Sequence, residues 1–271
     1  MNLVLLGSGG FVVPVFESLR LEHRVLQVFT RAPAACGRNK GVLSKTPVQE
    51  WAEQQGIPVK FDIKEFKGEG VDFAVVMSYG VIIPDEVLAR CKFINVHPSD
   101  LPKYRGPSPI RTALRNGDTR SAVCLCEMVH DVDAGPVYCR VPFDIGPDET
   151  NAMVQQKVSG LTTDLLRDFL SNPAAHYPPK EQEGQVILTR KTTHEDKVVD
   201  YDRGATVIHN RVRAYGSALL PVGGVLCKLL ETKVVDGDKL KIVRIQPCGK
   251  KEMDWKTFRN GHQVSSAMLV D

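Results

Sequence analysis

Residues 93–109 read FINVHPSDLPKYRGPSP, a short apolar strand that runs into a polar turn rich in proline and glycine. Asn95 and His97 stand two positions apart at the end of this strand, so both side chains point to the same face of an extended chain. A histidine can move a proton near neutral pH, and an asparagine amide can donate to a developing oxyanion. The pair is a candidate catalytic site; the structural alternative is a turn-forming asparagine beside a surface histidine.

The start of the chain predicts a doubly wound α/β domain. Residues 3–6 are apolar, Gly7-Ser8-Gly9-Gly10 follow, and an apolar helix pattern covers residues 13–19. A strand, a glycine turn and a helix in this order open many nucleotide-binding domains. Position 12 is valine, so the third glycine of the dinucleotide fingerprint is absent, and the turn is interpreted as a structural one.

Alternating strand and helix patterns continue along the first two thirds of the chain. Thr46-Pro47 predicts a helix start, with the threonine as N-cap and the proline in the first turn. Further strands are predicted at 25–30, 59–61, 71–77, 122–128 and 137–143, and further helices at 109–116 and 150–170. We predict a Rossmann-like, mostly parallel sheet with helices on both faces over residues 1–186.

The composition changes at residues 172–184, which are rich in proline and charge and are typical of a linker. Beyond them the pattern predicts a helix at 205–215 and strands at 224–230 and 239–246. Short strands with glycine-rich turns indicate a small β domain, residues 187–271.

The overall composition, 42% apolar and 25% charged, is that of an ordinary globular protein. No apolar run reaches the about 18 residues of a membrane-spanning helix, and residues 1–6 have no signal-peptide features. Cys124 and Cys126 share a strand face, but no second pair lies nearby, so no metal site is expected. Seven cysteines without a framework favour a reducing cytoplasm.

Three short motifs resemble those of the folate-dependent formyltransferases. They are Asn95-Val96-His97-Pro98-Ser99, Leu101-Pro102-Lys103-Tyr104-Arg105-Gly106 and Asp131-Val132-Asp133-Ala134-Gly135-Pro136. The similarity extends over most of the chain, and within this superfamily it is strongest to the enzymes that act on methionyl-tRNA. The resemblance implies an α/β catalytic domain followed by a small OB-like β-barrel.

The resemblance also implies catalytic roles for three residues. Formyl transfer to an amine passes through a tetrahedral intermediate, which requires an oxyanion donor and proton transfer. Asn95 is the expected oxyanion donor, and His97 is the expected proton-transfer group. Asp133 is expected to hold His97 or an ordered water; Asp131 is the competing carboxylate, and a turn before Gly135 is the structural alternative.

The formyl donor implied by the resemblance is 10-formyltetrahydrofolate. Two segments are similar to the folate-contacting loops of the family; an ordinary strand-to-helix connection is the alternative for the first of them. Asp100 replaces an apolar residue that is usual in the family, so its contact is expected to be shifted or to face solvent. The expected contacts are Ser78, Tyr79, Gly80, Val81, Ile82, Ser99, Asp100, Leu101 and Pro102.

A basic, glycine-containing stretch at residues 31–45 resembles the loop with which methionyl-tRNA formyltransferases reach the tRNA acceptor stem. Its cations would bind phosphate groups, whereas the plain alternative is a solvated loop. The net charge of +3 is weak evidence for a polyanionic partner. The residues expected to bind initiator methionyl-tRNA are Arg31, Arg38, Lys40, Lys45, Lys250 and Lys251.

The expected activity is therefore transfer of a formyl group to the amino group of methionine on initiator tRNA. The alternatives are a formyltransferase for a small amine, such as an amino sugar nucleotide or glycinamide ribonucleotide, and a non-catalytic RNA-binding protein on the same scaffold. The C-terminal domain is expected to be shortened, because Glu231-Thr232-Lys233 join directly two segments that lie further apart in the family. We expect a monomer.

Overall fold

The computed structural model describes residues 1–35, 43–264 and 268–270, and these residues form two units. The first unit consists of Met1–Pro107, Ala122–Phe143 and Gln155–Leu188. The second consists of Ser108–Ser121, Asp144–Val154 and the C-terminal segment that begins at Thr189. The assignment of a catalytic domain to residues 1–186 and of a tRNA-binding domain to residues 187–271 remains a prediction.

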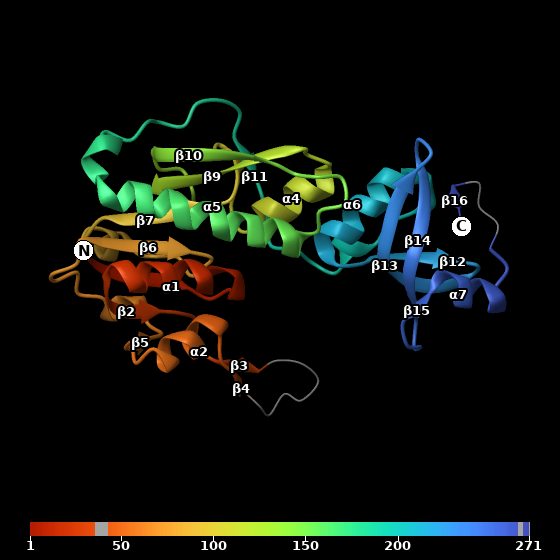
Figure 1. Cartoon of the computed structure of the whole chain (residues 1–271), viewed down its shortest axis with the longest axis horizontal. Helices are drawn as coiled ribbons and strands as arrows, with labels where there is room; N and C mark the ends of the chain where they lie inside the picture. The colour runs from red at the N-terminus through yellow and green to blue at the C-terminus, as the bar shows by residue number, and fades with distance from the viewer. Residues whose placement is uncertain (36–42, 265–267, 271) are drawn as a thin grey trace. The chain divides into compact units, whose positions relative to one another are not determined.

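A seven-stranded sheet forms the centre of the first unit, in the order β10-β9-β7-β6-β1-β2-β5 (Figure 1). The pairs from β7 to β5 are parallel, and β9 runs antiparallel to β7. This confirms the predicted mostly parallel sheet. The strands are β1 Asn2–Gly7, β2 Arg24–Phe29, β5 Val59–Lys60, β6 Phe73–Met77, β7 Phe93–His97, β9 Arg120–Glu127 and β10 Val137–Asp144.

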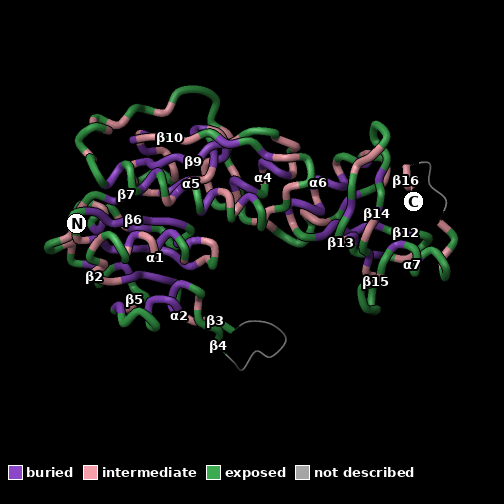
Figure 2. Tube along the Cα trace, in the orientation of Figure 1, coloured by how far each residue is buried: buried purple, intermediate pink, exposed green. Residues whose placement is uncertain are grey.

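Both faces of this sheet are covered, as its apolar runs predict. Figure 2 shows the central strands as buried along their length. On one face Gly7 closely approaches Phe16 of α1 (Val13–Glu22), and Phe73 packs its ring on Phe169 of α5 (Asn151–Ser171). On the other face Val4 and Leu6 join an apolar cluster with residues of η2 (Ile63–Glu65) and α3 (Asp85–Leu88).

The predicted helix after Thr46 is confirmed as α2, Pro47–Gln54. The Thr46 hydroxyl accepts a hydrogen bond from the Gln49 amide at 3.0 Å, so it caps the helix as its residue type predicts. Two short strand pairs complete the first unit. They are β3 (Ala34–Ala35) with β4 (Leu43–Ser44), and β8 (Lys103–Arg105) with β11 (Ile187–Leu188).

The second unit combines helices with a five-stranded sheet. The helices α4 (Pro109–Asn116) and α6 (Ala205–Tyr215) pack on each other, and α7 (Trp255–Gly261) follows the main strands. The predicted helices 109–116 and 205–215 are thus confirmed. The strands are β12 Ala218–Val222, β13 Val225–Val235, β14 Lys239–Pro247, β15 Met253–Asp254 and β16 Leu269–Val270.

One sequence-based expectation for the second unit was wrong. Glu231-Thr232-Lys233 are not a connection but lie inside β13, which pairs antiparallel with β14. The reversal comes later, at Asp236 and Gly237, both of which have positive φ. The pairing register shifts on both sides of Glu231, and such a bulge breaks the alternation by which strands are recognised in a sequence.

No helix among the described residues is long and apolar enough to cross a lipid bilayer. Cys124, Cys126 and Cys227 are buried and form no disulfide. Cys91 and Cys139 are partly buried and also form no disulfide.

Candidate active site

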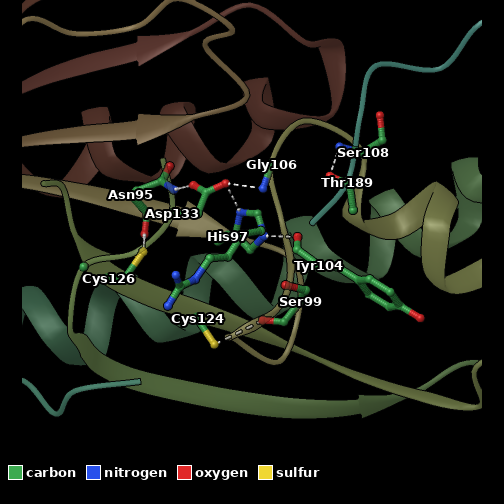
Figure 3. Close-up of polar contacts among 12 residues, drawn as sticks. Asn95, His97, Ser99, Tyr104, Gly106, Ser108, Cys124, Cys126, Asp133 and Thr189 are labelled. Carbon is green, nitrogen blue, oxygen red and sulfur yellow. Dashed lines mark hydrogen bonds and ion pairs between the residues drawn. The ribbon is translucent and has the colours of Figure 1, made fainter. Parts of the chain in front are cut away.

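The candidate site lies at the carboxyl end of β7, where Asn95 and His97 project from the same face of the strand (Figure 3). The strand is held on both sides, since Val76 of β6 pairs with Asn95 and Cys124 of β9 pairs with His97. His97 is buried, whereas Asn95 is partly exposed. The backbone of two neighbouring strands thus fixes this pair, as its position in the sequence predicted.

Asp133 comes from the β9–β10 connection and joins the same cluster (Figure 3). Its Oδ1 accepts a hydrogen bond from Asn95 Nδ2 at 2.8 Å, and its Oδ2 accepts one from the Gly106 amide at 2.7 Å. Its Oδ2 also lies 3.4 Å from His97 Nδ1. Only 12% of the Asp133 side chain is exposed, and the donors on Asn95 and Gly106 hold its carboxylate in one orientation.

The hydrogen bond of His97 Nε2 fixes the tautomer of its ring. Nε2 lies 2.9 Å from the carbonyl oxygen of Tyr104, which can only accept, so Nε2 carries a proton. In a neutral ring Nδ1 is then unprotonated and faces the Asp133 carboxylate. A hydrogen bond from Nδ1 to Asp133 therefore requires a second proton on the ring, and this carboxylate would stabilise the resulting imidazolium.

The backbone around the site is held in uncommon conformations. Ser78, Tyr104 and Asp133 all have positive φ, of 53°, 64° and 54°, which is rare for residues other than glycine. Gly106 also has positive φ, 107°, and presents its amide to Asp133. Strained residues of this kind concentrate at functional sites, where the surrounding structure holds them.

Two buried thiols lie directly opposite the pair, on the neighbouring strand β9. Cys126 Sγ lies 3.6 Å from the Asn95 carbonyl, and Cys124 Sγ lies 3.2 Å from the Ser99 carbonyl. Burial raises the pKa of both thiols, so they remain protonated donors rather than nucleophiles.

The structure places the first predicted folate segment directly after β6. Tyr79 is only 2% exposed and packs in the core, so its side chain is not at the surface. Its backbone carbonyl accepts a hydrogen bond from Ser8 Oγ. Val81 and Ile82 are adjacent apolar residues that are 41% and 78% exposed, which leaves them available to a flat ligand. Gly80 is also exposed and has positive φ.

The second predicted folate segment is mostly internal. Ser99 and Leu101 are buried, and Ser99 Oγ donates to the Lys103 carbonyl at 2.5 Å. Pro102 is buried as well. Asp100 faces solvent, which was one of the two outcomes expected for it. It accepts a hydrogen bond from Arg140 at 2.6 Å. Any contact of this segment with folate would come from its backbone or from Asp100.

The predicted tRNA-binding cations have different surroundings. Arg31, Lys250 and Lys251 are exposed. Lys45 is bound to Glu53 at 2.5 Å, so it would have to exchange this carboxylate for a phosphate. The remaining two, Arg38 and Lys40, lie outside the described residues.

Sequence reasoning missed the contacts that tie the site together. The Tyr104 carbonyl and the Gly106 amide contact His97 and Asp133, although backbone groups leave no side-chain signal in a sequence. No group of three or more histidine, cysteine or acidic side chains in the described ranges is placed to hold a metal ion.

A family model described as "Formyl transferase" matches residues 1–170. A methionyl-tRNA formyltransferase of Roseobacter denitrificans is 31% identical over 303 positions, covering 99% of this chain and 98% of that protein. One from Limosilactobacillus fermentum is 31% identical and covers 97% and 96% of the two chains.

Solved structures share the fold at lower identity. A sugar 3N-formyl transferase, WlaRD, has a TM-score of 0.70 at 16% identity and covers 93% of this chain and 99% of that one. A methionyl-tRNA formyltransferase from Clostridium thermocellum has a TM-score of 0.61 at 15% identity, with 90% and 99% covered. HypX from Aquifex aeolicus in complex with tetrahydrofolic acid has a TM-score of 0.66 at 15% identity, with 99% and 48% covered.

Proposed function

The chain belongs to the formyl transferase family, among the methionyl-tRNA formyltransferases, and we propose that it transfers the formyl group of 10-formyltetrahydrofolate to the α-amino group of methionyl initiator tRNA. The observation that carries the proposal is the cluster in which Asn95 donates to Asp133 and His97 Nδ1 lies 3.4 Å from the same carboxylate. The chain that carries these residues is similar to a methionyl-tRNA formyltransferase over 99% of its length.

Asn95 is the proposed oxyanion donor. A carboxamide nitrogen has two hydrogens, and Asp133 accepts only one of them from Asn95 Nδ2. The other can point at the formyl oxygen while the carbonyl carbon becomes tetrahedral. Because Asp133 fixes the orientation of the amide, this donor needs no rearrangement when negative charge develops.

Proton transfer is the proposed task of His97 and Asp133. A neutral amine attacks the formyl carbon, the new C–N bond forms, and the bond from carbon to the folate nitrogen then breaks. In this sequence one proton moves from the attacking nitrogen to the leaving nitrogen. His97 can accept it at Nδ1, the ring nitrogen that carries no proton, while Asp133 stabilises the charged ring.

We propose that folate lies along the exposed apolar residues Val81 and Ile82, next to this set. The family model and a fold shared with a tetrahydrofolate complex support a folate donor. Val129 and Val132 are also exposed apolar residues and belong to the same connection as Asp133. These four side chains would contact the flat ring system of the donor.

The second unit offers a further basic surface for tRNA. Lys233 of β13 and Lys241 of β14 are both exposed and directly opposite each other in the hairpin. Like charges in this position repel each other, and no acidic partner is found for either within the described ranges. A phosphate group would relieve the repulsion, so we propose these lysines alongside Lys250 and Lys251 as tRNA contacts.

The second candidate function is transfer to an amino sugar, since a sugar 3N-formyl transferase shares the fold over 93% of the chain. That likeness is one of fold alone. The deciding experiment offers the purified protein 10-formyltetrahydrofolate with either methionyl initiator tRNA or a nucleotide-linked amino sugar. We expect rapid formylation of the tRNA only; turnover of the sugar without turnover of the tRNA would overturn the proposal. As a translation enzyme it would act in the cytoplasm, as a monomer.

A further inference from the structure

Gln182 lies in the stretch 172–184 that the sequence presents as a linker, yet its side chain makes four hydrogen bonds. Its Nε2 donates to the carbonyl of Asp133 at 2.8 Å and to the carbonyl of Gly135 at 2.7 Å. Its Oε1 accepts from Arg105 Nε at 3.0 Å and from Arg105 Nη2 at 2.8 Å. Every donor hydrogen and both acceptor sites of the carboxamide are therefore used.

These four bonds join the two segments that hold the candidate catalytic side chains. Three consecutive residues of one segment act in turn: Tyr104 accepts from His97, Arg105 donates to Gln182, and Gly106 donates to Asp133. The other segment is the connection that carries Asp133, whose own carbonyl is held by Gln182. A single carboxamide thus fixes the backbone on both sides of the contact between Asp133 and Gly106.

The stretch around Gln182 is itself anchored to the first unit. Lys180 exchanges two backbone hydrogen bonds with Val137 of β10, at 2.7 and 2.9 Å. Further along, the Ile187 amide donates to the Pro102 carbonyl at 3.3 Å. Gln182 stands between these two attachments, so its side chain is presented from a fixed backbone.

We propose that Gln182 is a positioning residue for the candidate catalytic carboxylate, an inference that rests on the proposed formyl transfer. Asp133 has positive φ, a conformation that is unfavourable for this residue type unless its surroundings hold it. The two bonds from Gln182 Nε2 hold the carbonyl groups of Asp133 and Gly135 on either side of the turn. Without them the carboxylate would move relative to His97 and Asn95, and a displacement of about 1 Å can lower a rate by about a hundredfold.

The test compares Gln182→Met, which keeps the length of the side chain and removes its hydrogen bonds, with Gln185→Met as the matched control. Gln185 lies three residues further along, is exposed, and has no hydrogen bond within the described structure. We expect Gln182→Met to lower kcat about ten- to a hundredfold with little change in the KM for either substrate. The control should retain the parental kcat. A parental kcat in Gln182→Met would overturn the inference.

A second comparison separates positioning from a general structural effect. If Gln182 acts through the charge of Asp133, then Gln182→Met should lower kcat by less than about twofold in an Asp133→Asn background. An equal loss in both backgrounds would mean that Gln182 does not act through Asp133. Gln182→Glu keeps an acceptor for Arg105 but turns an oxygen toward two carbonyls, so it should lose at least as much activity as Gln182→Met.

Hydrogen exchange at the Gly106 amide provides a measurement that is independent of turnover. This amide donates to Asp133, so its exchange should accelerate in Gln182→Met and remain unchanged in Gln185→Met. Unchanged exchange together with unchanged kcat would sink the inference. If the parent protein formylated no tRNA, the proposed function would fail, while the exchange result would still show whether Gln182 orders the Asp133 turn.

Discussion

Asn95 donates its side-chain amide to Asp133 across 2.8 Å, from the end of one strand to the turn that follows the neighbouring one. The carboxylate can only accept, so this contact decides which end of the Asn95 carboxamide carries the hydrogens. Asp133 thereby aims the second N–H of Asn95. The relationship predicts that the two residues depend on each other in catalysis.

Asp133→Asn should therefore do more than remove a charge. An amide at position 133 presents an NH₂ group either to Asn95 Nδ2 or to the Gly106 amide, and both are donors. We expect the Asn95 carboxamide to flip and withdraw its oxyanion donor, with a loss of about two to three orders of magnitude in kcat. Single-turnover rates with charged tRNA measure this loss of activity.

Asn95→Ala should lower kcat by a similar factor, since it removes the same donor. The double variant Asn95→Ala/Asp133→Asn should be little worse than either single change, because the groups act as a unit. Fully additive losses in the double variant would contradict the coupling of the two residues.

His97→Ala should lower kcat by about two to four orders of magnitude, the usual contribution of a positioned proton-transfer group. Folate affinity should change little, because Nε2 is bonded to the Tyr104 carbonyl and the proposed role of Nδ1 is proton transfer rather than binding. Equilibrium binding of a folate analogue and steady-state turnover together test both statements. Turnover near the parental rate would remove His97 from the mechanism.

The sequence predicted the elements that depend on local pattern. Asn95 and His97 were identified because this candidate catalytic pair lies within one strand, where alternation places both side chains on one face. The Asp133 contact with Gly106 joins residues 27 apart, and the Gln182 contact with Asp133 joins residues 49 apart, so no local pattern encodes either. The β13 strand was predicted too short, because its bulge at Glu231 hides the alternation.

Gly135→Ala should disrupt the turn that carries Asp133. A Cβ at this position would lie 2.0 Å from the Glu127 carbonyl oxygen, so the backbone must move. We expect a loss of kcat of at least about a hundredfold, by displacement of Asp133. Gly160→Ala is the matched control, since this glycine is an exposed residue of α5 with open space at its Cβ. The control should keep full activity and gain about 0.5–1 kcal/mol in the free energy of unfolding.

The second unit should lose stability in mild acid because of His209. Burial lowers the pKa of this imidazole, which lies 2.9 Å from the Thr232 hydroxyl and 3.1 Å from the Pro147 carbonyl. The native state therefore favours the neutral ring. The contribution of the neutral His209 ring to the free energy of unfolding is complete above the unfolded pKa of about 6.5. It is lost as the pH falls through the lower pKa of the folded state.

Unfolding in urea between pH 8 and pH 5 measures this loss. With Trp51→Phe, Trp255 of α7 becomes the only tryptophan and reports on the second unit. His209→Gln should make the midpoint less dependent on pH over this range. An equal pH dependence in both proteins would mean that another group is responsible.

Two pairs of basic residues that lie far apart in the sequence should each contribute to tRNA binding. The double variants Arg38→Ala/Lys40→Ala and Lys233→Ala/Lys241→Ala each remove two cations, and Lys64→Ala/Lys67→Ala removes two exposed cations outside both proposed surfaces. If each lost side chain contacts a phosphate, the slope of log K against log salt should flatten by about one per contact in the first two variants. The control should retain the parental slope, and folate affinity should be the same in all three. An unchanged slope in the first two variants would favour the small-amine alternative over tRNA.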